Sequence, residues 1–169
     1  MSQFVFGYYA AAIVFLSVVV VTRKNPVHSV LFMLILFLHI AGVYILLNAE
    51  FLAAVQVIVY AGAILVLFVF AIMVLNLKEE QTVEIYVGSW AIAVAAALGL
   101  FVILLFGLRT VDVPSGGTFT AEYLKNTTNT KALGKEIFVN YLLPFEIVSI
   151  ILLVAIIGAI VLAKKKLKG

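Results

Sequence analysis

FLAAVQVIVYAGAILVLFVFAIMVLNL, residues 51–77, is the stretch of sequence that decides the fold. It contains no Asp, Glu, Lys, Arg or His. With a rise of about 1.5 Å per residue a helix of this length would span roughly 40 Å, more than the ~30 Å hydrocarbon thickness of a bilayer. The stretch therefore predicts a membrane-spanning helix that must tilt, bend or protrude.

The few polar and small residues of this stretch gather near its middle. Gln56 and Tyr60 are four residues apart and would share one face of a regular α-helix. Ala61, Gly62 and Ala63 follow directly. Glycine lowers helix stability, whereas small residues let a neighbouring helix approach closely. We therefore expect a packed interior helix with a local irregularity, and a π-bulge is a form of irregularity that is frequent at functional sites.

The composition places the whole chain in a lipid bilayer. Of its 169 residues, 66% are hydrophobic and 11% are charged, and the mean hydropathy is +1.27. No soluble domain of this size could bury so much apolar surface. Backbone groups in lipid must be satisfied within helices or a closed barrel, and long apolar runs without alternation exclude a barrel. The predicted fold is an all-α integral membrane protein.

Several classes of site are excluded by residue counts. The chain has no cysteine and two histidines, so disulfides, iron–sulfur ligation, thiolate zinc sites and a haem centre on this chain alone are not expected. Four lysines lie in the tail KKKLK at 164–168. In a membrane protein such a tail is typical of topology and lipid headgroup contact, so no nucleic-acid partner is expected. The sequence contains no nucleophile–base pair, phosphate loop or dinucleotide motif, so no catalytic site is expected on this chain.

Five apolar runs predict a bundle of five transmembrane helices in a single membrane domain, residues 1–169. The expected spans are about 4–22, 28–47, 51–77, 87–108 and 142–163, with one extramembrane loop at about 109–140. Pro26 favours a tight turn before the second helix. Because only a short link separates the second and third helices, they are expected to be antiparallel neighbours.

The basic residues predict the orientation of these helices. Five spans place the termini on opposite sides of the membrane. With a cytoplasmic C-terminus, seven of the eleven Lys and Arg residues lie inside, namely Arg23, Lys24, Lys78, Lys164, Lys165, Lys166 and Lys168. The other four lie in or beside the long loop. Basic residues in short connections carry most weight, so we expect N-out/C-in.

Three titratable residues are candidates for chemistry. Glu50 and Glu146 are expected in the first turns of their helices, where the helix dipole stabilises negative charge, with Asn48 capping the third helix. Proton handling or a salt bridge to a partner is the alternative role for both. His39 would lie roughly 16 Å deeper than His28 along its helix. It would either bond to a neighbouring helix or belong to a proton wire.

Several segments resemble one known family. They are NPVHS at 25–29, EFL at 50–52, VQVIVYAGAILVLFVFAIMVLNL at 55–77, ALG at 132–134 and YLLPFE at 141–146. These segments are similar to subunit J of bacterial proton-translocating NADH–quinone oxidoreductase, the counterpart of the sixth mitochondrially encoded membrane subunit of respiratory complex I. The most specific segment is VYAGAI at 59–64, and the resemblance covers most of the chain outside 112–128.

The resemblance implies a five-helix, multi-pass subunit of the membrane arm in the bacterial inner membrane, beside subunits of the A, H, K and N types. It implies no cofactor on this chain, because FMN, the iron–sulfur clusters and the quinone site belong to partner subunits. It also implies a non-catalytic part in coupling quinone reduction to proton translocation, through a third helix whose rotation opens or closes a water-filled connection. The residues implicated are Tyr60, Ala61, Gly62 and Ala63 as a π-bulge, and Glu79 or Glu80 as a carboxylate after the helix.

One position departs from the family pattern. Some family members have a carboxylate where this chain has Gln56, which can order water but cannot carry a proton at neutral pH. Our hypothesis is therefore a gate more than a relay. The alternatives are a J-like subunit of an F420H2- or ferredoxin-dependent oxidoreductase or of a multisubunit cation/proton antiporter. A stand-alone transporter is a third reading, disfavoured because the chain has no inverted repeat.

Overall fold

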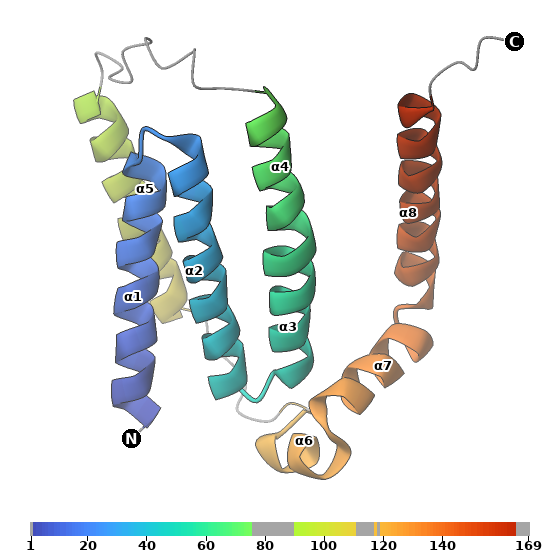
Figure 1. Ribbon diagram of the computed structural model, residues 1–169. Coiled ribbons are helices and arrows are strands. Elements are labelled where there is room, and N and C mark those ends of the chain that lie inside the picture. Colours follow the sequence, from blue (N-terminus) through green and yellow to red (C-terminus); the bar gives the residue numbers. More distant parts are fainter. Residues whose placement is uncertain (1, 76–89, 111–116, 118, 165–169) are drawn as a thin grey trace, which may run out of the picture. The chain divides into compact units, whose positions relative to one another are not determined.

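The computed structural model describes residues 2–75, 90–110, 117 and 119–164, and every regular element in these ranges is a helix (Figure 1). The elements are α1 (Ser2–Thr22), α2 (Pro26–Leu46), α3 (Glu50–Val55), η1 (Gln56–Ile64), α4 (Leu65–Leu75), α5 (Trp90–Thr110), α6 (Ala121–Thr127), α7 (Asn129–Val139) and α8 (Leu142–Ala163). Two compact units result, Met1–Thr118 and Phe119–Gly169. The all-α prediction is confirmed.

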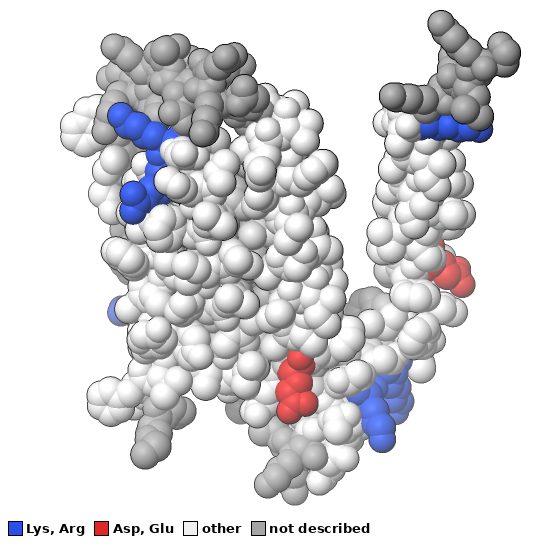
Figure 2. Space-filling view, viewed as in Figure 1, with Lys and Arg blue, Asp and Glu red and all other residues white. Residues whose placement is uncertain are grey.

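Among the described residues, five helical spans are long and apolar enough to cross a membrane, which agrees with the predicted number and makes this a multi-pass membrane protein. They are Gln3–Thr22, Pro26–Leu46, Glu50–Leu75, Trp90–Thr110 and Leu142–Ala163. Figure 2 shows the charged side chains of the described helices near the helix ends, with uncharged surface between them. The N-out/C-in orientation and the single membrane domain stay predictions. Residues 76–89, which hold the predicted end of one span and the start of the next, lie outside the described part.

The first connection is the tight turn that Pro26 predicts. The Oδ1 atom of Asn25 accepts a hydrogen bond from the Val27 N–H at 3.0 Å, which caps α2 at its N-terminus. The Ser29 hydroxyl donates to the Val20 carbonyl of α1 at 2.5 Å. That carbonyl is in the last turn of α1, where carbonyls have no partner within their own helix. The turn therefore supplies a hydrogen-bond partner to a backbone N–H at the start of α2 and to a carbonyl at the end of α1.

The second connection differs from the expectation, because Asn48 does not cap the third helix. The cap position of α3 is Ala49, and no side chain caps it. Asn48 instead has φ 56°, with its N–H bonded to the Ile45 carbonyl and the Ala49 N–H bonded to the Tyr44 carbonyl. This pair of bonds is the Schellman arrangement, in which asparagine can take the left-handed position. Asn48 therefore ends α2 and does not start α3.

Within the first unit, α2 packs against α1 on one side and against the α3–η1–α4 span on the other (Figure 1). Val30, Leu65 and Ile72 form a buried cluster between α2 and α4, and the residues packed on it are Val27, Met33, Leu34, Phe37 and Val69. The α2 positions 27, 30, 34 and 37 alternate steps of three and four, which is the spacing of a helix–helix seam. This seam fixes how α2 meets the long apolar span.

The segment expected as an extramembrane loop contains two short helices, α6 and α7, and its place outside the membrane stays a prediction. The Thr120 hydroxyl accepts from the Tyr123 N–H at 3.2 Å and caps α6. The polar composition of this segment concealed α7, whose Ala132 is buried. The rings of Phe138 and Phe145 lie 5.1 Å apart and connect α7 to α8 within the second unit.

Candidate functional site

The third span is interrupted by a π-helix, η1, which covers nine residues from Gln56 to Ile64. At its end the Leu65 N–H donates to the Tyr60 carbonyl, five residues earlier, instead of the carbonyl four residues earlier. The structure confirms the π-bulge predicted near Tyr60–Ala63, and the distortion extends further than expected. It starts at Gln56, where the first polar residue of the span lies.

The π-helix shifts the register of the buried stripe on this span. The buried residues of the span are Ala53, Gln56, Ala61, Leu65 and Ile72. Gln56 and Ala61 are five residues apart, whereas neighbours on one face of an α-helix are three or four apart. The extra residue in this turn is the signature of a π-bulge. It places Ala61, and not Tyr60, in line with Gln56.

The predicted shared face of Gln56 and Tyr60 was therefore wrong. Gln56 is 6% exposed, whereas Tyr60 is 45% exposed. The prediction used α-helical spacing, and the π-helix removes the basis for it. Tyr60 does keep one contact with the neighbouring helix: its ring lies 6.1 Å from the ring of Phe37 on α2, at an interplanar angle of 85°. This edge-to-face geometry is favourable for an aromatic pair.

Gly62 has a specific steric reason to be glycine. A Cβ atom added there would lie 3.3 Å from the Val57 carbonyl oxygen, five residues earlier. A contact this short requires the carbonyl to move by a few tenths of an ångström. Gly62 and Ala63 are on the exposed side of η1, while Ala61 is buried. The small residues of the motif thus serve two different faces of the π-helix.

His39 lies in an aromatic cluster between α1 and α2. Its Nδ1 atom is 2.8 Å from the Ile35 carbonyl oxygen, and its Nε2 atom is 3.4 Å from the Tyr8 hydroxyl. Because a carbonyl can only accept, Nδ1 carries the hydrogen, and in the neutral ring Nε2 accepts from Tyr8. The centroid of the Tyr9 ring lies 5.8 Å from that of the imidazole, at an interplanar angle of 70°. A hydrogen bond to the neighbouring helix was one of the two predicted roles for His39, and this geometry supplies it.

Gly42 seats the Tyr9 ring in this cluster. A Cβ atom at Gly42 would come within 2.5 Å of the Tyr9 ring, so the ring occupies the space that a side chain would fill. Sequence reasoning missed Tyr8, Tyr9 and Gly42. A signal was present: in an antiparallel helix pair the tyrosines and His39 lie at nearly equal sequence distances from the turn at 23–25. Residues equidistant from a tight turn face each other across the pair.

The predicted candidates do not form one site. Phe37, which contacts η1, and His39, which contacts α1, are two residues apart on α2 and point to different neighbours. In the described ranges no hydrogen bond or ring contact connects His39 to Gln56 or Tyr60. The same ranges hold no group of three or more His, Cys, Asp or Glu that could bind a metal ion.

The carboxylates lie apart from both clusters. Glu50 is the first residue of α3, so it lies in the first turn as predicted, where it suits the helix dipole. Glu146 is the fifth residue of α8, so the predicted first-turn position was wrong because the helix begins at Leu142. The dipole effect falls off within the first turn. Glu79 and Glu80 lie outside the described residues.

The comparisons with known proteins agree with the helical spans and the motif. The family described as NADH-ubiquinone/plastoquinone oxidoreductase chain 6 matches residues 16–162. The chain is 38% identical to NADH-quinone oxidoreductase subunit J of Rickettsia conorii over 168 residues, which cover 97% of this chain and 81% of the relative. It is 42% identical to NAD(P)H-quinone oxidoreductase chain 6 of Synechocystis sp. over 151 residues, which cover 88% and 73%. The resemblance stated from the motifs is thereby confirmed, and the chain belongs to the NADH-ubiquinone/plastoquinone oxidoreductase chain 6 family, which includes the J subunits.

Proposed function

We propose that this chain is a membrane-arm subunit of a proton-translocating NADH–quinone oxidoreductase in the bacterial inner membrane, oriented N-out/C-in. The names of its relatives and the match over most of the chain support this proposal. In this assignment the chain lies beside subunits of the A, H, K and N types. FMN, the iron–sulfur clusters and the quinone site belong to other subunits of the complex, and this chain contributes no catalytic residue.

Its proposed part in the machine is a conformational gate at η1. The observation that carries the proposal is the step of five between the buried residues Gln56 and Ala61. If η1 became a regular α-helix, its hydrogen bonds would join residues four apart instead of five. The residues after η1 would then be rotated about the helix axis relative to the residues before it. One residue of an α-helix corresponds to a rotation of about 100°. In this proposal the π-helix and the regular α-helix are the two arrangements that a switch requires.

The rotation has definite consequences for the packing against α2. With α-helical spacing from Gln56, the next seam position becomes Tyr60 in place of Ala61. The Tyr60 ring would then move from its edge contact with Phe37 into the seam. Exchanging a methyl group for a phenol at a helix interface changes both the space and the polarity there. Such a change can open or close a hydrated passage beside the span.

The gate is proposed to work without proton transfer by the motif itself. Gln56 does not titrate near neutral pH, and the remaining residues of η1 other than Tyr60 have no titratable side chain. In this proposal the motif changes which groups face a passage, and other groups carry the protons. Quinone reduction would drive the rotation through the partner subunits. Proton translocation would respond to it.

Two experiments test the proposal at different levels. Purification of the native assembly and identification of its subunits tests the assignment: flavin and iron–sulfur subunits that oxidise NADH are expected, whereas antiporter-like subunits alone would refute it. Deletion of Ala61 tests the gate, because it removes the extra residue and favours a regular α-helix. The expected result is an assembled complex that still oxidises NADH with a soluble artificial acceptor but has lost coupled quinone reduction. Normal pumping after the deletion would exclude a gate at η1.

A further inference from the structure

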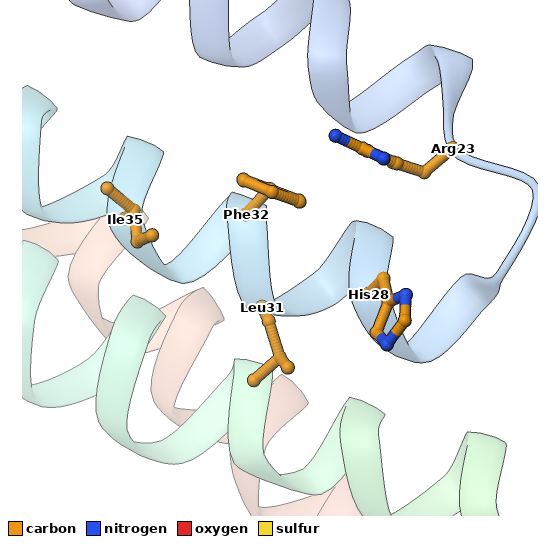
Figure 3. A pocket seen from close by; sticks show the side chains of 5 residues that line it. All are labelled: Arg23, His28, Leu31, Phe32 and Ile35. Carbon is orange, nitrogen blue, oxygen red and sulfur yellow. The ribbon is translucent and has the colours of Figure 1, made fainter.

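A pocket lies at the turn between α1 and α2, away from both clusters described above. It has a volume of about 380 Å³, and the residues lining it are Arg23, His28, Leu31, Phe32 and Ile35. Figure 3 shows the Arg23 side chain extending from the end of α1 toward the Phe32 ring, with the other lining residues along α2. The polar residues lie at the end next to the turn, and the apolar residues continue along the helix.

The guanidinium of Arg23 is held at the mouth of this pocket. Its central carbon lies 4.9 Å from the centroid of the Phe32 ring, within the range of a cation–π contact. Arg23 directly follows the membrane-length helix α1, and an arginine at such a position can place its stem on apolar surface and its charged end in the polar boundary. A planar guanidinium fixed in this way presents paired N–H donors that match a phosphodiester.

The lining residues of α2 form one continuous stripe. His28, Leu31 and Ile35 are spaced three and four apart, and all three are exposed. The stripe descends from the turn by about 10 Å along the helix. The other face of α2 carries Val30 and Leu34 and packs on α4. The pocket therefore opens away from the core of the unit, toward the surroundings of the chain.

We propose that this pocket binds an anionic phospholipid, with its phosphate on Arg23 and His28 and an acyl chain along Leu31 and Ile35. The charge at the boundary and the apolar stripe below it match the two parts of such a molecule. The aliphatic stripe alone would fit a partner helix equally well, whereas the cationic mouth favours a phosphate. The site is independent of the gate at η1 and adds a ligand to the proposed function.

Photo-crosslinking in native membranes tests the site. A photoactivatable leucine analogue replaces Leu31, and in a control protein it replaces Leu153 of α8, a similarly exposed residue that is not part of the pocket. The adducts are identified by mass spectrometry. We expect lipid adducts at Leu31 to be enriched in anionic phospholipid about fivefold over those at Leu153, the effect of about one surface cation.

Two substitutions decide whether the pocket causes the enrichment. Arg23→Gln is expected to reduce it to the control value, whereas Arg109→Gln, at the last turn of another helix, is expected to leave it unchanged. Ile35→Trp, which fills the apolar part, is expected to lower the yield of lipid adducts without removing Arg23. The proposal is overturned if the probe at Leu31 labels a polypeptide, if its adducts match those at Leu153, or if the enrichment survives Arg23→Gln.

Discussion

Phe37 of α2 and Tyr60 of η1 lie with their ring centroids 6.1 Å apart and their planes at 85°, the one aromatic pair among the described residues that joins the π-helix to α2. Phe37 also packs on the buried cluster between α2 and α4. The contact therefore links Tyr60 of η1 to the packed cluster between α2 and α4. A substitution of Phe37 or Tyr60 should therefore change the packing of the other.

The first prediction concerns this aromatic pair. Phe37→Leu and Tyr60→Leu should each lower the temperature at which the complex dissociates, because edge-to-face pairs contribute about 1 kcal/mol beyond their buried area. The double variant should lose less than the sum of the two, since the interaction can be lost only once. Dissociation temperatures of the four proteins in a double-mutant cycle measure this. Strictly additive effects would show that the rings do not interact, and Tyr60→Phe serves as the control that keeps the ring.

The second prediction concerns Gly62. Gly62→Ala should lower coupled quinone reduction by less than about twofold, because the Val57 carbonyl needs to move only slightly. Gly62→Leu should lower it by more than about tenfold while the complex still assembles, because a bulky side chain crowds the π-turn. Gly158→Leu is the matched control, since a Cβ there meets nothing within 4 Å. Equal effects at the two glycines would contradict a specific role for Gly62.

The third prediction uses the absence of native cysteine from the sequence. In the resting state, Tyr60→Cys should react readily with a small membrane-permeant maleimide, whereas Ala61→Cys should be protected, because Tyr60 is exposed and Ala61 buried within the chain. During turnover the protection should decrease at position 61 and increase at position 60. Labelling rates measured with and without NADH report the change. Identical rates in both states would argue against rotation of η1.

The fourth prediction concerns Gly42 and Tyr9. Gly42→Ala should weaken the pairing of α1 with α2, because its methyl group would occupy the place of the Tyr9 ring. The same substitution in a Tyr9→Ala background should cost little, since the ring is no longer there to be displaced. Comparing assembled complex in membranes for the two backgrounds measures the difference. An equal loss in both would place the cause of the Gly42 effect elsewhere.

The fifth prediction separates the two carboxylates. Glu50→Gln should lower the stability of the complex by about 0.5 kcal/mol, because Glu50 occupies the first turn of α3 where the helix dipole favours negative charge. Glu146→Gln should have a smaller effect, since Glu146 lies beyond the first turn of α8. Thermal dissociation and proton pumping are measured for both. A large loss of pumping with intact assembly for either variant would assign it to proton handling instead.

The sequence predicted much of the fold from local properties. Each long apolar run is long enough to cross a bilayer as a helix, and in lipid a helix satisfies its own backbone groups. The number of spans therefore followed from the number of apolar runs. Pro26 marked the tight turn because proline fixes its own backbone and restricts the residue before it. The VYAGAI motif predicted the π-bulge through its resemblance to a family, since glycine alone indicates weakness in a helix without specifying its form.

Other features depend on what each segment meets in space. Tyr8, Tyr9 and His39 are distant in the sequence, and only the pairing of α1 with α2 brings them together. Asparagine is common both at the start and at the end of helices, and the hydrogen bonds of the turn show that Asn48 ends α2. The polar stretch before α8 looked like a loop because its helices are short and of low hydropathy, with a side-chain cap on α6 and a buried Ala132 on α7.

The long apolar stretch at 51–77 illustrates what the sequence determines and what the tertiary structure determines. The sequence by itself determined that residues 51–77 must include a membrane helix, because no other structure satisfies so many backbone groups in lipid. The tertiary structure decided which side chains that helix buries. The five-residue hydrogen-bond spacing of η1, next to α2, changes which residues of the helix share a face. Gln56 and Ala61 therefore face inward, and Tyr60 meets Phe37 at the edge of the seam.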